Sequence, residues 1–246
     1  MQIKVLSIFP ELFDAFLNGS LLGRAIAAGL LNVEVSDLRD FATDRHRTVD
    51  DVPYGGGGGM VMKAEPWLAA VRATAGERAH RVLLSPQGRR LDEAKVIALA
   101  EHQELVLLCG RYEGVDERVR ESVVDEEVSI GDFVLSGGEL GAMVIIEAVS
   151  RQIPGVVGLA DSVENDSFRH GLLDFPHYTR PREVEGRAVP EILLSGDHGA
   201  VARWRREQAL RATWEKRPDL LEGADLSQDD RRFLARLVEV ESSEPR

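Results

Sequence analysis

Short apolar runs and longer amphipathic segments alternate along the first part of the chain. Residues 3–9 and 105–109 are rich in aliphatic side chains, so they predict buried strands. Between such runs, segments such as 91–100 place apolar residues on one face of a helix. Strands that alternate with helices build a parallel sheet with helices on its faces. The pattern therefore predicts an α/β domain over residues 1–160.

The pattern changes after this domain. Residues 161–172 are polar and follow no period, which predicts an interdomain linker. Prolines bracket the stretch 174–181 and favour an extended backbone there. Beyond it, helices are expected around 204–214 and 229–240. We expect residues 173–246 to form a small C-terminal helical domain.

Three predicted strands end in glycine-containing loops of related character. These loops are Ser85–Gly88, Gly110–Gly114 and Ile130–Gly138. Because ligands of open α/β sheets bind at the carboxyl ends of the strands, three such loops side by side predict a ligand site. Taken alone, the last of these loops fits a bulged strand followed by a turn equally well.

The residues of the three loops indicate what the site would bind. They supply apolar walls, backbone donors and the acids Glu113, Asp132 and Glu139. No lysine is expected within reach of a triphosphate. A ligand with a purine, a ribose and a positively charged centre therefore fits better than a nucleotide polyphosphate.

A run of five glycines, Gly55–Gly59, follows Pro53 and Tyr54 in a long polar segment. The run does not match a phosphate-binding P-loop, because Lys63 is not followed by Ser or Thr. It does not match the dinucleotide-binding Rossmann pattern either, because Met60 stands where that pattern has its last glycine. A loop that closely approaches a ligand is favoured, and a flexible surface connection is the alternative.

Composition and charge narrow the function classes. A formal net charge of −12 and a pI near 5.0 argue against a protein that coats nucleic acid along a broad basic surface. The single cysteine, Cys109, excludes an internal disulfide, and the six histidines show no zinc-binding spacing. No signal sequence and no apolar window of about 18 residues is recognised. We expect a cytoplasmic protein without a membrane segment.

The local charge between Arg203 and Arg217 is opposite in sign to the total. Six basic and two acidic residues give this stretch a charge of +4, and Trp204 and Trp214 lie among them. Arginines that neutralise phosphates, beside aromatic rings that stack on bases, are typical of an RNA-binding helix. The alternative is a solvated helix face with both tryptophans in the core.

Five motifs together resemble a known family. They are VPYGGG at 52–57, SPQG at 85–88, CGRYEG at 109–114, SIGDFVLSGGE at 129–139 and DFPHYTRP at 174–181. Their identity and order are similar to those of bacterial tRNA (guanine-N1)-methyltransferases of the TrmD type, members of the SPOUT methyltransferase superfamily. The resemblance covers the chain from Met1 to about Leu221.

The resemblance implies a fold, a reaction and partners. The fold would be a parallel-sheet SPOUT domain with a deep trefoil knot, in an obligate homodimer with the active site at the subunit interface. The reaction would transfer a methyl group from S-adenosyl-L-methionine to N1 of the guanosine immediately 3′ of the anticodon, position 37, in tRNA. Mg²⁺ is a further candidate cofactor, although no ligand cluster for it stands out in the sequence.

By match of motif, the resemblance also assigns residues to the site. The cofactor would be held by Leu84, Pro86, Gly110, Tyr112, Ile130, Gly131, Asp132, Phe133, Val134, Leu135 and Gly138. The tRNA would be bound by Tyr54, Gly55, Asp174, His177, Tyr178 and Arg203. Phe133 and Gly141 stand where many relatives carry Tyr and Pro, a difference that concerns the fine shape of the pocket.

The chemistry of guanine indicates which catalytic groups are needed. N1 carries a proton, so its methylation needs a general base and a donor that stabilises charge on O6. Among the linker acids Asp161, Glu164 and Asp166, the resemblance assigns Asp166 as the base and Arg151 as its electrostatic partner. The alternative for Asp166 is to cap a helix after the linker. Methyl transfer is a positioned displacement, so we expect no role for Cys109.

Two other functions remain open on the sequence alone. The first is a non-catalytic RNA-binding module, in which the glycines only permit tight packing and no S-adenosylmethionine binds. The second is a methyltransferase of the same fold that acts on 2′-hydroxyls or on ribosomal RNA. Mapping of the methylated nucleoside would separate the second function from tRNA guanine methylation.

Overall fold

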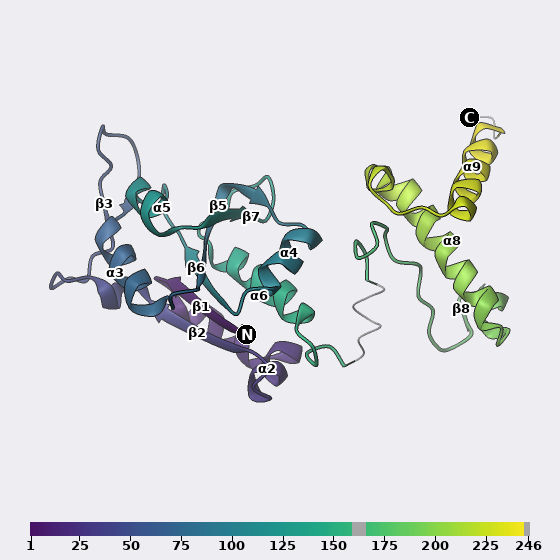
Figure 1. Cartoon of the computed structure of the whole chain (residues 1–246), viewed down its shortest axis with the longest axis horizontal. Coiled ribbons are helices and arrows are strands. Elements are labelled where there is room, and N and C mark those ends of the chain that lie inside the picture. Colours follow the sequence, from purple (N-terminus) through teal and green to yellow (C-terminus); the bar gives the residue numbers. More distant parts are fainter. Residues whose placement is uncertain (159–165, 244–246) are drawn as a thin grey trace. The chain divides into compact units, whose positions relative to one another are not determined.

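The computed structural model describes residues 1–158 and 166–243, which belong to two compact units (Figure 1). The first unit is Met1–Ala160 and the second is Asp161–Arg246. Each unit has its own hydrophobic core. Among the described helices, none combines the length and the apolar character that a bilayer crossing requires.

The first unit is built on a five-stranded sheet in the order β2-β1-β6-β5-β7. All neighbouring strands of this sheet run parallel. The strands are β1 (Gln2–Ser7), β2 (Asn32–Asp37), β5 (His80–Arg90), β6 (Glu104–Cys109) and β7 (Glu126–Ser129). A separate two-stranded ribbon pairs β3 (Asp50–Asp51) with β4 (Val61–Met62). The predicted α/β class with a parallel sheet is confirmed.

Helices cover both faces of the sheet and create two core layers (Figure 1). The helices of this unit are η1 (Pro10–Phe13), α1 (Asp14–Asn18), α2 (Ser20–Ala27), η2 (Leu38–Phe41), α3 (Ala64–Thr74), α4 (Glu93–Ala100), α5 (Glu117–Val123) and α6 (Glu139–Gln152). One layer packs α2, α4 and α6 on the sheet through residues such as Leu22, Val96 and Ile145. The other layer packs α3 and α5 through residues such as Trp67 and Val119.

Strand β6 lies in the middle of the sheet, as its sequence predicts. Residues 105–109 have no solvent exposure, because alternate side chains enter the two core layers. A strand that is apolar on both faces can be accommodated only between two helical layers. Cys109 ends this strand as a fully buried residue.

Two predicted elements of the first unit differ from the structure. The apolar positions between Pro10 and Gly29 predict one helix, but the structure divides it at Gly19, because Ser20 adopts a left-handed conformation with φ 57°. The turn expected at Ser85–Gly88 lies inside β5, whose pairing with β7 shifts between Leu84 and Arg89. The strand and turn expected over 128–135 are found as the end of β7 at Ser129 and the loop after it.

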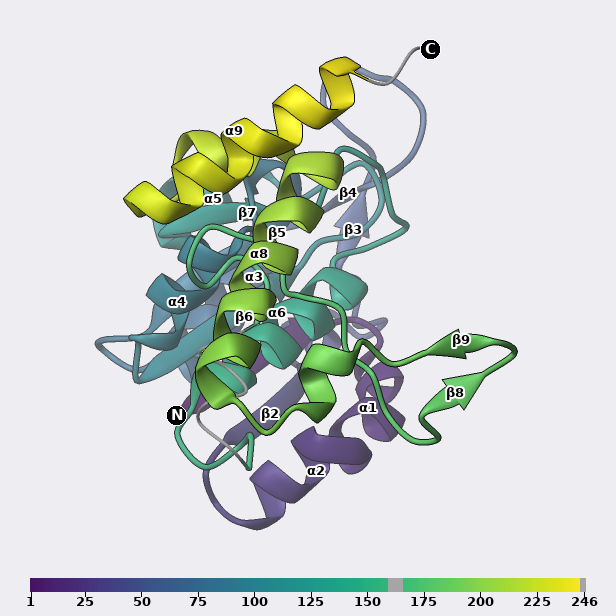
Figure 2. The ribbon, with the colours of Figure 1, turned by 90° about the vertical axis from the view of Figure 1, so that its right-hand side faces the viewer.

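The second unit contains a short hairpin and two main helices. Its elements are β8 (Glu183–Val184), β9 (Arg187–Ala188), η3 (Glu191–Leu194), α8 (His198–Lys216), η4 (Pro218–Glu222) and α9 (Gln228–Ser243). Asp197 caps α8 by accepting a hydrogen bond of 2.9 Å from the Ala200 amide. Leu172 and Leu210 are at the centre of the core. The β8–β9 hairpin projects from the helices of this unit (Figure 2).

Candidate active site

A cavity of about 1170 Å³ lies at the carboxyl ends of β5, β6 and β7. It is lined by residues from all three loops that the sequence singles out, together with residues 51–54 and 61–65. Ligand pockets usually measure about 300–1,000 Å³. The cavity is therefore large enough for a cofactor and for part of a second molecule.

The three loops approach one another closely. The Gly138 amide donates a hydrogen bond of 2.9 Å to the Gly110 carbonyl. A Cβ atom on Gly138 would lie 2.8 Å from Cys109 Cα and from Leu84 Cβ, so only glycine fits between these strand ends. Tyr112 adopts φ 61°, which is uncommon for an aromatic residue and is found more often at ligand sites.

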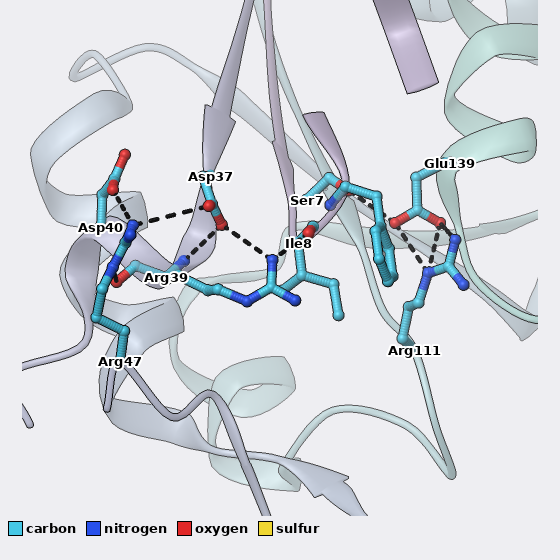
Figure 3. A network of polar contacts seen from close by, with 9 residues as sticks. Ser7, Ile8, Asp37, Arg39, Asp40, Arg47, Arg111 and Glu139 are labelled. Atoms are coloured by element: carbon cyan, nitrogen blue, oxygen red, sulfur yellow. Dashed lines mark hydrogen bonds and ion pairs between the residues drawn. The ribbon is translucent and has the colours of Figure 1, made fainter. Parts of the chain in front are cut away.

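A buried ion pair connects the cavity loops to the first strand (Figure 3). Arg111 Nε lies 3.1 Å from both carboxylate oxygens of Glu139, and its Nη2 lies 3.1 Å from Oε2. The Ser7 hydroxyl donates a further hydrogen bond of 2.7 Å to Glu139 Oε1. Phe9 packs under the guanidinium, whose carbon lies 4.3 Å from the ring centre. The ends of β1 and β6 and the start of α6 are thus held together.

A second polar network lies beside the first and orders the polar segment after β2 (Figure 3). Arg47 pairs with Asp40 and lies 3.7 Å from Asp37. Arg39 donates to the backbone carbonyl of Ile8 and lies 3.6 Å from Asp37. This part of the long segment predicted as a loop is therefore fixed to the end of β1.

Three expectations about charges in the cavity differ from the structure. Glu139 is only 1% exposed and is bound by Arg111, so it does not face a ligand. Asp132 is exposed and is not among the residues that line the cavity, whereas Glu113 lines it. Lys63 also lines the cavity, although no lysine was expected there.

Most of the residues predicted to hold the cofactor lie together. Asp132 is the exception, and the other ten line the cavity: Leu84, Pro86, Gly110, Tyr112, Ile130, Gly131, Phe133, Val134, Leu135 and Gly138. Leu84 is nearly buried, while Phe133 and Val134 are 55% and 85% exposed. The cavity therefore has one well-packed wall and one wall of exposed apolar side chains.

The residues predicted to bind tRNA are divided between the two units. Tyr54 lines the cavity of the first unit and is fully exposed, while Gly55 adopts φ 86° next to it without lining the cavity. In the second unit, Asp174 contacts His177 at 2.8 Å. Tyr178 and Arg203 are exposed.

The two predicted catalytic residues lie in different units. Arg151 is in the last turn of α6. Asp166 is in the second unit, where its carbonyl accepts a hydrogen bond of 3.3 Å from the Arg169 amide. Turns rather than a helix follow Asp166, so the structure gives no support to a helix-capping role. Asp161 and Glu164 lie outside the described residues.

The Ser7–Arg111–Glu139 network was not recognised from the sequence. Arg111 belongs to a quoted motif, but its partner Glu139 was interpreted as an acid of the ligand site. An arginine after one buried strand and a glutamate that opens a helix in an apolar segment could have indicated a buried pair. Buried charges are nearly always paired.

The local environment shifts the pKa of two side chains near the cavity. A hydrogen bond from the Arg118 side chain lowers the pKa of Asp116, which lines the cavity and caps α5. Burial raises the pKa of the Cys109 thiol, so this residue is unreactive at neutral pH. Over the described parts of both units, no cluster of three or more His, Cys, Asp or Glu side chains is arranged to hold a metal ion.

Together, the fold and the cavity define a class of protein. It is an α/β protein with a cavity of ligand size at the carboxyl edge of a parallel sheet, where such folds bind ligands, and with a second, smaller unit after it in the chain.

Comparison with known proteins gives the family. Residues 1–223 match the family described as tRNA (Guanine-1)-methyltransferase TrmD. The chain is 55% identical over 241 residues to a protein of Geobacter metallireducens, covering 97% of this chain and 98% of the relative. It is 54% identical over 238 residues to a protein of Proteus mirabilis, covering 96% and 95%. Both relatives are named tRNA (guanine-N(1)-)-methyltransferase. The chain belongs to the TrmD family and is a methyltransferase, which confirms the resemblance seen in its motifs.

Proposed function

We propose that this chain transfers a methyl group from S-adenosyl-L-methionine to N1 of the guanosine immediately 3′ of the anticodon, position 37, in tRNA. Methylation of guanine N1 in tRNA follows from the family, to which the chain is similar over nearly its whole length. The observation that carries the finer proposal is the cavity lined by residues of all three motif loops.

The cavity fits S-adenosylmethionine in chemistry as well as in size. Leu84, Ile130 and Leu135 give apolar surface for an adenine ring, and Glu113 supplies a negative charge near which a sulfonium would be stabilised. Gly138 and Gly141 lie so close to Leu84 that a side chain at either position would occupy the space beside it. When bound, the cofactor supplies an activated methyl group. Mg²⁺ is proposed from the resemblance alone.

Asp166 and Arg151 are proposed to act on the guanine. A carboxylate at Asp166 accepts the N1 proton and leaves a nucleophilic nitrogen. The guanidinium of Arg151 donates to O6, where negative charge develops as the proton leaves. Because the two residues belong to different units, they must be brought to one guanine when the tRNA is bound.

A trefoil knot and a homodimer complete the proposal. The knot is supported by the contacts between the loops at 110–114 and 130–138, including the bridge between Arg111 and Gly137. The dimer is supported by exposed apolar side chains next to the cavity, including Leu140 and Val144 one turn apart on α6. A second copy that covers this surface would place the active site at the subunit interface.

The assignment of the base is tested by Asp166→Ala. Turnover of a tRNA transcript should fall by about 10²–10⁴-fold, because proton transfer loses its acceptor. Arg151→Ala should also lower turnover more than cofactor binding. S-adenosylmethionine affinity, measured by calorimetry, serves as the control and should stay close to that of the unchanged protein. Substantial turnover by Asp166→Ala would remove the residue from the mechanism.

The position of the product is tested separately by mass spectrometry of nucleolytic fragments of the tRNA. The methyl group should be found on N1 of the guanosine 3′ of the anticodon. A methyl group on a 2′-hydroxyl, or on ribosomal RNA only, would contradict the proposal. A protein that binds no S-adenosylmethionine would be a non-catalytic module instead.

A further inference from the structure

A second cavity of about 430 Å³ lies within the second unit. One side of it is formed by residues 175–180, from the proline-bracketed stretch 174–181, together with Arg182, and another by α8. Its apolar side chains include Val189, Leu193 and Val201. The segment was predicted to be extended, and residues 173–179 adopt neither helix nor strand. An extended segment next to a helix leaves a recess between them.

The aromatic residues of this cavity differ in their availability. Phe175 is covered, because the Arg205 guanidinium lies 4.9 Å from its ring centre and the His177 ring lies 4.7 Å away. Tyr178 and Trp204 have ring centres 6.4 Å apart with a tilt of 53°, and Tyr178 is 49% exposed. The Tyr178 ring therefore remains available to stack with a planar group.

The arginine, aspartate and glutamate side chains that line the cavity are all arginines. Arg180, Arg182 and Arg205 line it, and none of the described residues that line it is Asp or Glu. Arg182 is paired with Glu191 at 2.5 Å, outside the lining. A cationic rim on a chain with a net charge of −12 favours a polyanionic partner.

We propose that this cavity holds an unpaired base of the bound tRNA, one other than the guanosine that is methylated. The base stacks on Tyr178 beside Trp204, and the arginines contact the neighbouring phosphates. Aromatic rings that stack on bases, next to arginines on the backbone, characterise sites for single-stranded RNA. The methylated guanine must present its N1 edge to the methyl donor, so a base enclosed here serves recognition. This inference rests on the proposed function, because it takes tRNA as the substrate.

The stacking is tested by equilibrium binding of unmodified tRNA to Tyr178→Ala and Tyr178→Phe. Loss of the ring should weaken binding on the order of 10- to 100-fold. Tyr178→Phe keeps the ring and should recover most of this loss. Equal losses in the two variants, or unchanged binding by Tyr178→Ala, would overturn the proposal. S-adenosylmethionine affinity and the thermal melt exclude a folding defect.

The salt dependence of tRNA affinity distinguishes the contact made by the Tyr178 ring from the contacts made by the arginines. Arg180→Gln should reduce the magnitude of the slope of log affinity against log salt by about 0.7, because one phosphate contact is lost. Tyr178→Ala should weaken binding without changing this slope. A change of slope in Tyr178→Ala, or an unchanged slope in Arg180→Gln, would contradict the assigned contacts.

Crosslinking shows which base occupies the cavity. A set of tRNA transcripts, each carrying one photoreactive base analogue in the anticodon stem-loop, is irradiated with the full chain and the crosslinked peptides are identified. At least one position other than the methylated guanosine should crosslink to Tyr178 or Trp204. The proposal fails if only the methylated guanosine reacts there, or if no position does. These assays need no turnover, so an enzyme that binds tRNA but methylates a different position would contradict the proposed function alone.

Discussion

Gly138 stands where two strand ends leave no space for a side chain. Its conformation, φ −78°, is open to any residue, so the requirement for glycine is steric. The neighbours that a Cβ would meet are Cys109 Cα and Leu84 Cβ, which belong to central strands and cannot rotate away. The strand ends can therefore lie this close together only because residue 138 has no Cβ atom.

Gly138→Ala should separate the ends of β5 and β6. We expect a loss of about 1–3 kcal/mol in the free energy of unfolding, typical of overpacking, together with weaker S-adenosylmethionine binding. Thermal denaturation and calorimetric titration measure the two effects. Gly223→Ala is the matched control, because no atom lies within 4 Å of the added carbon, and it should change neither value. Cofactor binding as tight in Gly138→Ala as in the control would show that the loops tolerate the displacement.

Glu139 and Arg111 form the charged contact on which the same loops depend. Glu139→Gln keeps the shape of the side chain but leaves a guanidinium that is 20% exposed without its anionic partner. The free energy of unfolding should fall by roughly 1–3 kcal/mol. Asp229→Asn, which removes an exposed pair with Arg232, should cost less than about 1 kcal/mol. Equal costs in chemical denaturation would mean that burial adds nothing to the Arg111–Glu139 pair.

Among the elements, α8 and α9 are joined by an ion pair that makes the second unit sensitive to pH. Arg206 lies 2.9 Å from Asp230, which is 6% exposed and also accepts a hydrogen bond from the Ser227 amide. The hydrogen bond from Arg206 is the main cause that lowers the pKa of Asp230. A carboxylate with a lowered pKa in the folded state stabilises that state above its unfolded pKa, about 3.9.

Asp230→Asn should therefore destabilise the protein by a constant amount between about pH 5 and 7. The difference from the unchanged chain should shrink as the pH falls below about 4, because Asp230 takes up a proton there in the unfolded chain, and in the folded chain only at lower pH. Denaturant unfolding followed by tryptophan fluorescence at several pH values measures this difference. A difference that grew on acidification would have the wrong sign for a lowered pKa.

Individual elements also show how much of the fold could be predicted from the sequence alone. β6 was predicted because five successive apolar residues can be buried only between two layers. The division of the first helix at Gly19 could not be predicted, because the left-handed Ser20 gives no signal in a helical pattern. The continuation of β5 beyond Pro86 was missed because Ser-Pro-Gln-Gly favours a turn: Leu84 and Arg89 both pair with Val128, and the four residues between them interrupt the pairing without ending the strand.

The same limit applies to the candidate site. The three loops were found because each follows a strand, and ten of the predicted cofactor residues line one cavity. Ser7 and Glu139 were not paired in advance, because local pattern carries no information about partners this distant in sequence. The cavity of the second unit was missed for a related reason, since Tyr178 and Trp204 lie in different predicted elements.

For the whole molecule, the proposed dimer makes a prediction about mixed subunits. If the cofactor loops of one subunit work with Asp166 of the other, a dimer of Asp166→Ala and Gly138→Ala subunits retains one intact site. At an S-adenosylmethionine concentration at which the Gly138→Ala homodimer turns over little, random mixing of the two variants should then recover about a quarter of the unchanged activity. Each variant alone, unfolded and refolded identically, is the control. Activity that stays at the level of the controls would place each complete site within a single subunit.

The contact between Ser7 and Glu139 has a consequence for synthesis on the ribosome. The two residues are 132 positions apart. At about 5–20 residues per second, roughly 7–26 s separate their polymerisation. During that time β1 can pair with β2. Glu139, which accepts the hydrogen bond from Ser7, and the rest of α6, which closes the cavity, have not yet been synthesised. The methyl donor can therefore bind only after more than half of the chain has been translated, and it cannot assist the earliest folding steps.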